Sequence, residues 1–225
     1  MTDDVRIVLL GGLWLDASAW DGVVAELGNA VAVTLPGQGD GNTAATLDDQ
    51  IAAAVAVVDA APGRSVVVGH SAACTLAWLV ADARPAKVSK VVLIGGFPNA
   101  DGQSYADFFP AENGAMAFPG WEPFEGPDSA DLSPEARAEF SAKAIPVPEG
   151  VSKATVHLTD ERRYDIPVVM VCPEYTPAQA REWIDAGELP ELARAKHVDL
   201  VDIDSGHWPQ LTKPAELAAI LAKLQ

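Results

Sequence analysis

The chain has 225 residues, 49% of them hydrophobic, and a formal net charge of -17 at pH 7. This length and composition allow one large domain with a sizeable buried core, and they exclude a disordered protein. The strong negative charge argues against nucleic acid and against an anionic membrane surface as partners. We therefore interpret the acidity mainly as a source of solubility.

Two cysteines, Cys74 and Cys172, lie in apolar surroundings. We expect buried free thiols in a reducing compartment, because a disulfide framework would require more cysteines. Residues 1–6 lack the basic segment and apolar core of a secretory signal, and no apolar run is long enough to span a bilayer. These features predict a cytoplasmic protein.

The first part of the chain alternates predicted strands and helices. Nearly continuous apolar runs, typical of buried strands, occur at residues 5–10 and 88–96, and two further strands are predicted at residues 30–35 and 65–69. Helical spacing of apolar residues occurs at residues 19–27, 47–60 and 72–83. Thr46 is the predicted N-cap of the second helix, because Asp49 follows it by three residues and acidic side chains favour the first turn.

The alternation stops after Gly96 and resumes near residue 165. Residues 97–150 are rich in proline, glycine and acidic side chains, and a helix is predicted to start near Ser133. The aromatic residues of this segment are Phe97, Tyr105, Phe108, Phe109, Phe118, Trp121, Phe124 and Phe140. A loop of this length inside a compact domain is usually functional, so we predict a small cap rather than a linker.

The last part of the chain returns to strands and helices. Strands are predicted at residues 165–172 and 198–203, and helices at residues 176–184 and 214–224. Alternating strands and helices are typical of an α/β fold with right-handed crossovers. We therefore predict a core domain built from residues 1–96 and 151–225, with residues 97–150 as a cap or lid subdomain.

A strand that turns sharply into a helix surrounds Ser71. The sequence Gly69-His70-Ser71-Ala72-Ala73 has the layout of a nucleophile elbow, in which the turn exposes the serine hydroxyl. Small neighbours are needed because strand and helix pass close together. The usual pattern is Gly-x-Ser-x-Gly, and Ala73 replaces its last glycine with the next smallest side chain.

A serine hydroxyl needs a base to become a good nucleophile. His207 directly follows the last predicted strand, and both it and Ser71 lie at carboxyl ends of parallel strands, where α/β folds place their sites. We interpret His70 as a packing residue that points away from the site, His197 as a surface residue, and His157 as a residue without identified partners.

Two backbone amides are candidates for stabilising an oxyanion. Ala72 begins the elbow helix, and Leu13 follows the glycine pair Gly11-Gly12, which lets the backbone approach a substrate closely. The cysteines and histidines show no spacing typical of metal ligands, and the glycine loops match no dinucleotide or P-loop fingerprint. We expect no metal and no cofactor.

Four segments together resemble the compact, single-domain α/β-hydrolases that include plant methylesterases and hydroxynitrile lyases. They are Leu10-Gly11-Gly12-Leu13-Trp14, Leu35-Pro36-Gly37-Gln38-Gly39, the elbow, and Ser205-Gly206-His207-Trp208-Pro209. They follow the family's order, and only the cap is unmatched. Gly11 and Gln38 replace common histidines, although the backbone carries the function at both positions. The resemblance implies a mostly parallel sheet with helices on both faces and a small cap inserted after the strand that follows the elbow helix.

The same resemblance implies an acid after the strand at residues 168–172. The family's acid position falls near Thr176, which cannot support an imidazolium electrostatically. Glu174 lies two residues earlier, has a longer side chain, and keeps the order serine, acid, histidine. Asp101, after the preceding strand, is the alternative acid. Glu174 could also be only a favourable charge at a helix N-terminus.

We expect a cofactor-independent serine hydrolase, a carboxylesterase that acts on a small apolar ester. Ser71, His207 and Glu174 would form the triad, and the Leu13 and Ala72 amides would hold the oxyanion. The predicted substrate pocket contains Trp14, Phe108, Phe109, Trp121 and Trp208. A lyase that uses His207 as its base, as related hydroxynitrile lyases do, and a ligand-binding or sensing protein on a hydrolase scaffold are the alternatives. The sequence leaves the oligomeric state open.

Overall fold

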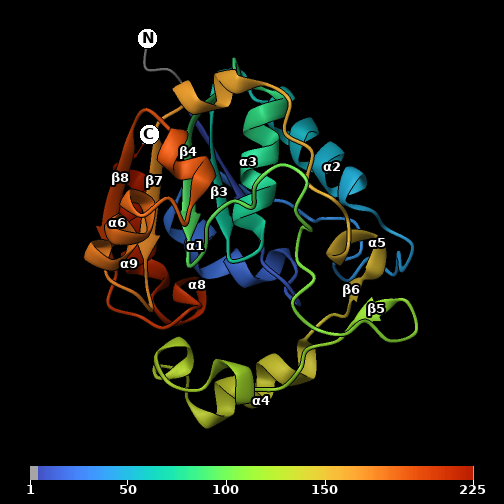
Figure 1. The fold of residues 1–225 in the computed structure, drawn as a ribbon. Coiled ribbons are helices and arrows are strands. Elements are labelled where there is room, and N and C mark those ends of the chain that lie inside the picture. The colour runs from blue at the N-terminus through green and yellow to red at the C-terminus, as the bar shows by residue number, and fades with distance from the viewer. Residues whose placement is uncertain (1–4, 225) are drawn as a thin grey trace.

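A six-stranded sheet forms the centre of the computed structural model, which describes residues 5–224 (Figure 1). Its order is β2-β1-β3-β4-β7-β8, and every pairing is parallel. The strands are β1 (Arg6–Leu10), β2 (Ala30–Ala32), β3 (Ser65–His70), β4 (Val88–Ile94), β7 (Val168–Cys172) and β8 (Val198–Asp202). The continuous apolar runs predicted this parallel sheet, although β2 is shorter than the predicted strand at residues 30–35.

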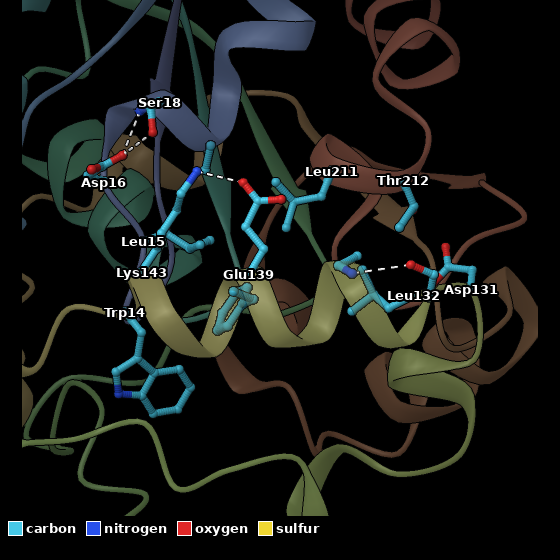
Figure 2. A pocket seen from close by; sticks show the side chains of 14 residues that line it. Trp14, Leu15, Asp16, Ser18, Asp131, Leu132, Glu139, Lys143, Leu211 and Thr212 are labelled. Atoms are coloured by element: carbon cyan, nitrogen blue, oxygen red, sulfur yellow. Dashed lines mark hydrogen bonds and ion pairs between the residues drawn. The ribbon is translucent and has the colours of Figure 1, made fainter.

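The first part of residues 97–150 runs past α3 (Ala73–Ala83), where the Asn99 amide donates a hydrogen bond to Thr75, and α4 lies below the sheet in Figure 1. The elements of residues 97–150 are β5 (Ala115–Met116), η2 (Glu122–Phe124), η3 (Pro127–Ser129), α4 (Pro134–Lys143), β6 (Val147–Pro148) and the start of α5 (Glu149–Ser152). Ser133 caps α4 by accepting a hydrogen bond from the Ala136 amide, as the predicted helix start requires. Figure 2 shows α4 facing Leu15 and Leu211 of the remaining structure.

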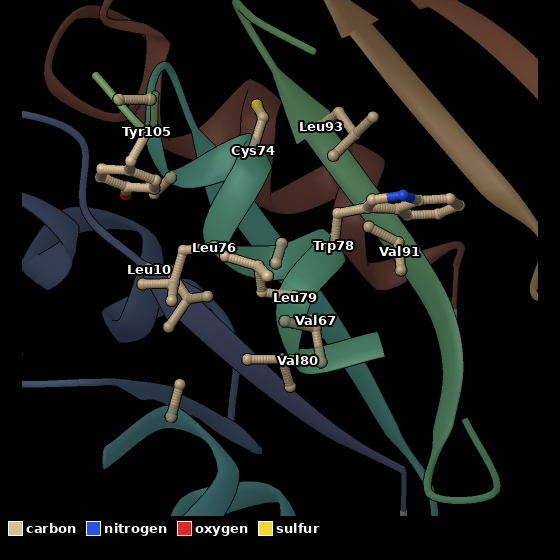
Figure 3. Packing of buried hydrophobic residues seen from close by; sticks show 14 of the residues in the cluster. Leu10, Val67, Cys74, Leu76, Trp78, Leu79, Val80, Val91, Leu93 and Tyr105 are labelled. Carbon is tan, nitrogen blue, oxygen red and sulfur yellow. The ribbon is translucent and has the colours of Figure 1, made fainter. Parts of the chain in front are cut away.

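Alternate side chains of the central strands enter two separate cores. Ile7 and Leu9 pack with α1 (Asp21–Glu26) and α9 (Pro214–Ala222), which cover one face of the sheet. Val8 and Leu10 point to the other face, which three further helices cover. These are α2 (Leu47–Asp59), α3 (Ala73–Ala83) and α6 (Pro177–Asp185). Figure 3 shows α3 in this second core, with Leu76, Trp78 and Val80 among strand residues.

The helix boundaries follow local sequence signals. Thr46 and Asp49 form a capping box at the start of α2, in which each side chain accepts a hydrogen bond from the backbone amide of the other. The helix predicted at residues 19–27 is divided into η1 (Ala17–Trp20) and α1. Short elements without a clear apolar period were not predicted: η4 (Glu161–Asp165), α7 (Pro190–Arg194) and α8 (Pro209–Thr212).

Both cysteines are buried thiols, as predicted. Among residues 5–224, no helix combines the length and the apolar character needed to cross a membrane. The cytoplasmic location stays a prediction.

A buried ionic cluster joins α3 to the segments that precede β7 and β8. The Arg163 guanidinium lies 3.1 Å from an Asp82 carboxylate oxygen and 3.0 Å from Glu191 Oε2. The Trp78 indole and the Tyr164 hydroxyl also donate to Glu191. All three charged side chains are less than a tenth exposed. Removing one member would therefore leave buried charges without a partner.

Replacement of the Arg163 side chain should destabilise the fold. Arg163→Met is expected to lower the free energy of unfolding by about 3–5 kcal/mol, because Asp82 and Glu191 would remain as buried carboxylates without this cationic partner. Urea unfolding measures the change. The control is the neighbouring, exposed Arg162, which pairs with Asp160. Arg162→Met should leave the urea midpoint almost unchanged because exposed ion pairs contribute little. An equal loss of unfolding free energy in both variants would contradict the expectation that the buried ion pairs stabilise the fold more than the exposed one.

Candidate active site

Ser71 lies at the apex of the turn between β3 and α3 with a φ of +55°. This left-handed conformation is uncommon for a residue with a β-carbon, and such strain is concentrated at functional sites. The turn is held by hydrogen bonds from the Ser71 amide to the Ile94 carbonyl at 2.8 Å and from the Cys74 amide to the Ser71 carbonyl at 2.9 Å. The neighbouring strand β4 therefore fixes the backbone that carries the hydroxyl.

The close approach of β3 to α3 explains the small residues of the elbow. A β-carbon at Gly69 would lie 2.2 Å from the Ala73 carbonyl oxygen, so only glycine fits there. Ala73 is the first residue of α3, and its own side chain is fully buried. The departure from the Gly-x-Ser-x-Gly pattern is thus accommodated at Ala73, whereas Gly69 permits no side chain.

Adjacent strands bring Glu174 and His207 together. Glu174 follows β7, His207 follows β8, and the two strands pair in parallel, so their loops leave the same edge of the sheet. His207 Nδ1 lies 2.8 Å from Glu174 Oε1. Since a carboxylate accepts this hydrogen bond, Nδ1 carries the proton and Nε2 of the neutral ring keeps its lone pair. Gly95, with a φ of +58°, packs against both side chains, and its missing side chain leaves room for them.

The other two acid positions considered from the sequence have different partners. Asp101 is exposed, and its Oδ1 accepts a hydrogen bond from the Leu158 amide at 2.9 Å. Thr176 caps α6 by accepting a hydrogen bond from the Gln179 amide at 3.2 Å. Within residues 5–224, Glu174 is the carboxylate that forms a hydrogen bond with the His207 ring.

The glycine loop (residues 11–14) passes directly beside the elbow. A β-carbon at Gly12 would lie 3.1 Å from the Ser71 β-carbon, so the loop closely approaches the serine. Among residues 5–224, the amides of Leu13 and Ala72 donate no hydrogen bond. Both N–H groups are therefore available to a ligand. Trp14 ends the loop with a φ of +63°, a second strained residue beside Ser71.

Ser71 and His207 border the same cavity, here called the serine cavity, with a volume of about 230 Å³. Its lining residues are Leu13, Trp14, His70, Ser71, Phe108, Phe109, Phe124, His207 and Trp208. Four of the five predicted pocket aromatics are among them. The fifth, Trp121, packs behind Trp208 at a ring separation of 5.4 Å and donates a hydrogen bond to Ser141. Phe124 lies in the wall of the serine cavity in place of Trp121. The aromatic composition of the segment alone could not show which of its rings line the cavity.

A second hollow, the α4 cleft, has a volume of about 520 Å³ and lies between α4 and the loop after β1 (Figure 2). Leu132 and Phe140 of the 97–150 segment face Leu15 and Leu211 across it. Its charged lining residues are Asp16, Asp131, Glu139 and Lys143, and no histidine or cysteine lines the cleft. Ser71 and His207 therefore line the smaller serine cavity and not this cleft, and Trp14 borders both spaces.

His70 differs from its predicted role. Its ring is buried, as expected for a packing residue, but it does not point away from the site, because it lies 5.0 Å from the His207 ring. Its Nε2 is 2.7 Å from the His207 carbonyl oxygen. Burial lowers the pKa of His70 to about 3, so the ring is neutral at physiological pH. His157 and His197 are exposed.

Asp128 is a contact that the sequence did not indicate. Its carbonyl accepts a hydrogen bond from the His207 amide at 2.7 Å, which joins the 97–150 segment to the loop that carries the histidine. Burial raises the pKa of the Asp128 carboxyl. In the part of the chain that the structure describes, no group of three or more potential ligands could hold a metal ion.

The burial of His70 predicts an acid-sensitive stability. Its pKa is about 3 in the folded protein and near 6.5 in an unfolded chain, so between these values the unfolded state binds the extra proton. The free energy of unfolding should therefore fall as the pH drops through this range, with up to ~1.4 kcal/mol per pH unit from this group. His70→Gln should flatten the dependence measured by urea unfolding, whereas His197→Gln should not. If the unfolding free energy of His70→Gln and of wild type changed with pH in parallel, His70 would not be the origin of the acid sensitivity.

Comparisons with known proteins identify an esterase relative of this chain. Esterase Rv0045c from Mycobacterium tuberculosis is 34% identical over 119 residues, which cover 50% of this chain and 39% of that protein. The matched region thus spans about two fifths of the relative's length.

Two solved structures cover nearly the whole chain. One is an extracellular alpha/beta-hydrolase from a Paenibacillus species, described as sharing structural and functional homology with tobacco salicylic acid binding protein 2. It is 21% identical, with a TM-score of 0.79 over 97% of this chain and 98% of that one. The other is the methylesterase MES16 from Arabidopsis, 15% identical, with a TM-score of 0.73 over 98% of both chains. These likenesses show a shared fold.

The sequence profile of the Alpha/beta hydrolase family matches residues 7–220. The match begins in β1, includes the elbow and the loops that carry Glu174 and His207, and ends in α9. Because the profile covers almost the entire described sheet and its connecting loops, the chain belongs to the alpha/beta hydrolase family.

Proposed function

We propose that this protein is a serine carboxylesterase that hydrolyses a small, uncharged, apolar ester. The observation that carries the proposal is the 2.8 Å hydrogen bond between His207 Nδ1 and Glu174 Oε1, since His207 and Ser71 both border the serine cavity. A strained serine and an oriented imidazole are the two parts that acyl transfer requires. The names of the relatives, an esterase and a methylesterase, support the same reaction class.

Acyl transfer would proceed in two steps. Ser71 Oγ attacks the ester carbonyl while His207 Nε2 accepts the hydroxyl proton. The same nitrogen then returns that proton to the departing alkoxide, and an acyl-enzyme and an alcohol result. In the second step His207 Nε2 takes a proton from water as its oxygen attacks the acyl-enzyme, and then gives this proton to the departing Ser71 Oγ, which releases the carboxylic acid and free Ser71. Glu174 holds the imidazole in the required tautomer and stabilises its charged form.

The oxyanion of each tetrahedral intermediate needs donors that are already in place. The amides of Leu13 and Ala72 are suited to this task, because they flank Ser71 and donate no hydrogen bond within residues 5–224. Loss of one such donor typically lowers kcat by about 10²–10³-fold. The close contact between Gly12 and Ser71 supports a two-amide oxyanion hole at this position.

The serine cavity limits the substrate in size and charge. A cavity of about 150 Å³ can hold benzene, so 230 Å³ corresponds to a group of roughly nine heavy atoms. Phe109, Phe124 and Trp208 provide apolar walls, and no lysine or arginine lines the cavity. A carboxylate on the substrate would lose its hydration without gaining a cationic partner. These features favour a neutral ester over an anionic one.

The 97–150 segment would act as a cap on a core formed by residues 1–96 and 151–225. It contributes Phe108, Phe109 and Phe124 to the serine cavity, so it would shape the substrate site directly. The Trp14 indole also donates a hydrogen bond to the Met116 carbonyl at 3.2 Å. The Asp128 carbonyl also accepts a hydrogen bond from the His207 amide. These two bonds connect the segment to the glycine loop and to the loop that carries His207.

Loss of the nucleophile should abolish the reaction. Ser71→Ala is expected to lower kcat for p-nitrophenyl butyrate by at least about 10⁴-fold, because the acyl-enzyme cannot form. Mass spectrometry of the released carboxylic acid distinguishes hydrolysis from lyase chemistry, and circular dichroism checks the fold. Ser89→Ala is the control, since Ser89 lies in β4 and donates to the Ser65 carbonyl. Retained turnover in Ser71→Ala would refute the proposal.

The identity of the acid can be tested with isosteric amides. Glu174→Gln should lower kcat by about 10³–10⁴-fold with little change in KM, because an amide favours the wrong tautomer of His207. Asp101→Asn should retain wild-type kcat, since Asp101 pairs with the Leu158 amide. Steady-state kinetics of the two variants decide between the carboxylates. A larger loss in Asp101→Asn than in Glu174→Gln would reverse the assignment.

A further inference from the structure

We propose that His70 is a positioning residue: its ring holds the histidine loop (residues 203–208), and with it His207, against the elbow and the glycine loop. This inference rests on the proposed esterase function, since it assigns a role within that reaction. His70 does not touch the reacting atoms in the mechanism above, and its proposed action passes through the His207 backbone.

The two ring nitrogens of His70 have different partners, which define its tautomer. Nε2 lies 2.7 Å from the His207 carbonyl oxygen, and a carbonyl can only accept, so Nε2 carries the proton. Nδ1 lies 3.2 Å from Gln210 Nε2, and in a neutral ring this nitrogen accepts the amide proton. Gln210 belongs to α8, which starts two residues after His207. One ring is thus bonded to the chain at both His207 and Gln210.

Burial makes these hydrogen bonds difficult to replace. His70 is 1% exposed and Gln210 is 2% exposed, so water has little access to either side chain. If the ring were replaced by an apolar side chain, the His207 carbonyl would lose its donor in a partly buried position. The loop would then be expected to shift until that carbonyl found another donor.

Three functional segments meet at this ring. His70 immediately precedes Ser71, so its backbone is part of the elbow. A β-carbon on Gly12 would lie 2.8 Å from His70 Nδ1, which places the glycine loop in close contact with the imidazole. The hydrogen bond to the His207 carbonyl adds the histidine loop. Any displacement of the ring therefore changes the spacing between nucleophile, oxyanion donors and base.

The hydrogen bond from His70 complements the one to Glu174. Glu174 acts on the His207 side chain and restrains the rotation of the imidazole through Nδ1. It does not define where the backbone of His207 lies. That position depends on the carbonyl contact with His70 and on the amide contact with Asp128 at 2.7 Å. With backbone and ring both restrained, His207 Nε2 has a defined direction.

Three substitutions test this role. His70→Leu removes the ring donor, His70→Gln retains an amide donor of similar reach, and Gln210→Leu removes the partner of Nδ1. Trp78→Phe is the matched control, because it also removes a buried ring N–H, the donor to Glu191 at 2.8 Å, but outside the site. Readouts are kcat and KM for p-nitrophenyl butyrate, the rate of Ser71 labelling by a fluorophosphonate, and crystal structures of the folded variants.

His70→Leu should lower kcat and the labelling rate by about 100-fold with KM within about twofold of wild type, as expected for a misplaced base. His70→Gln should recover most of this loss, and Gln210→Leu should show a decrease of about tenfold. Trp78→Phe should keep wild-type kcat, although its stability falls. If His70→Leu fails to fold, Gln210→Leu carries the test by the same readouts.

Three outcomes would overturn the inference. The first is an unchanged kcat in folded His70→Leu or Gln210→Leu. The others are a loss of kcat that His70→Gln does not reduce, and an equal loss of kcat in Trp78→Phe. Failure of the proposed function has a different signature, since the wild-type protein would then neither hydrolyse the ester nor accept the label. In that case the crystal structures still decide. A His207 backbone that keeps its position in His70→Leu would overturn the positioning role, and a displaced loop would support it.

Discussion

The β-carbon that Gly69 lacks would lie 2.2 Å from the Ala73 carbonyl oxygen, and this approach of β3 to α3 is the constraint on which the site depends. A chain that reverses from strand to helix in so little space must include a residue with left-handed backbone angles, and Ser71 is that residue. The surrounding sheet holds this strained conformation through the hydrogen bond from Ser71 to Ile94. A conformation that is costly in isolation is therefore stable within the sheet.

The parallel sheet supplies the other half of the arrangement. Because all six strands run in the same direction, the loops after β1, β3, β7 and β8 leave the same edge. Residues separated by more than a hundred positions in sequence, such as Ser71 and His207, thereby border one cavity. The proposed charge chemistry would take place at this edge, among the aromatic side chains that line the serine cavity.

The aromatic residues of the 97–150 segment serve two purposes. Phe118, Trp121 and Phe140 pack against one another with ring separations of 5.1 to 5.3 Å, and they join the segment to the core cluster that contains Trp14 and Trp208. Phe109 and Phe124 instead reach the serine cavity and contact Trp14. A segment that packs internally can present a defined wall to a ligand, which a mobile linker cannot. Substrate selection, under the proposed function, would therefore depend on this wall.

Local sequence patterns determined the parts of this protein that depend on local physics. Apolar runs predicted the buried parallel strands, Thr46 and Asp49 predicted the start of α2, and the small residues around Ser71 predicted the elbow. Each of these signals comes from backbone sterics or from the burial of neighbouring residues, and both act over a few positions.

Only the tertiary structure decided which distant side chains meet. Glu174 lies beside His207 because β7 pairs with β8 in a particular register, and Thr176 is occupied in capping α6. Three further features likewise depend on how loops pack across the sheet edge. They are the inward position of His70, the place of Phe124 in the cavity wall, and the contact of Asp128 with the His207 amide. Such contacts have no local period, since the residues that form them are joined by the fold and not by their spacing in the chain.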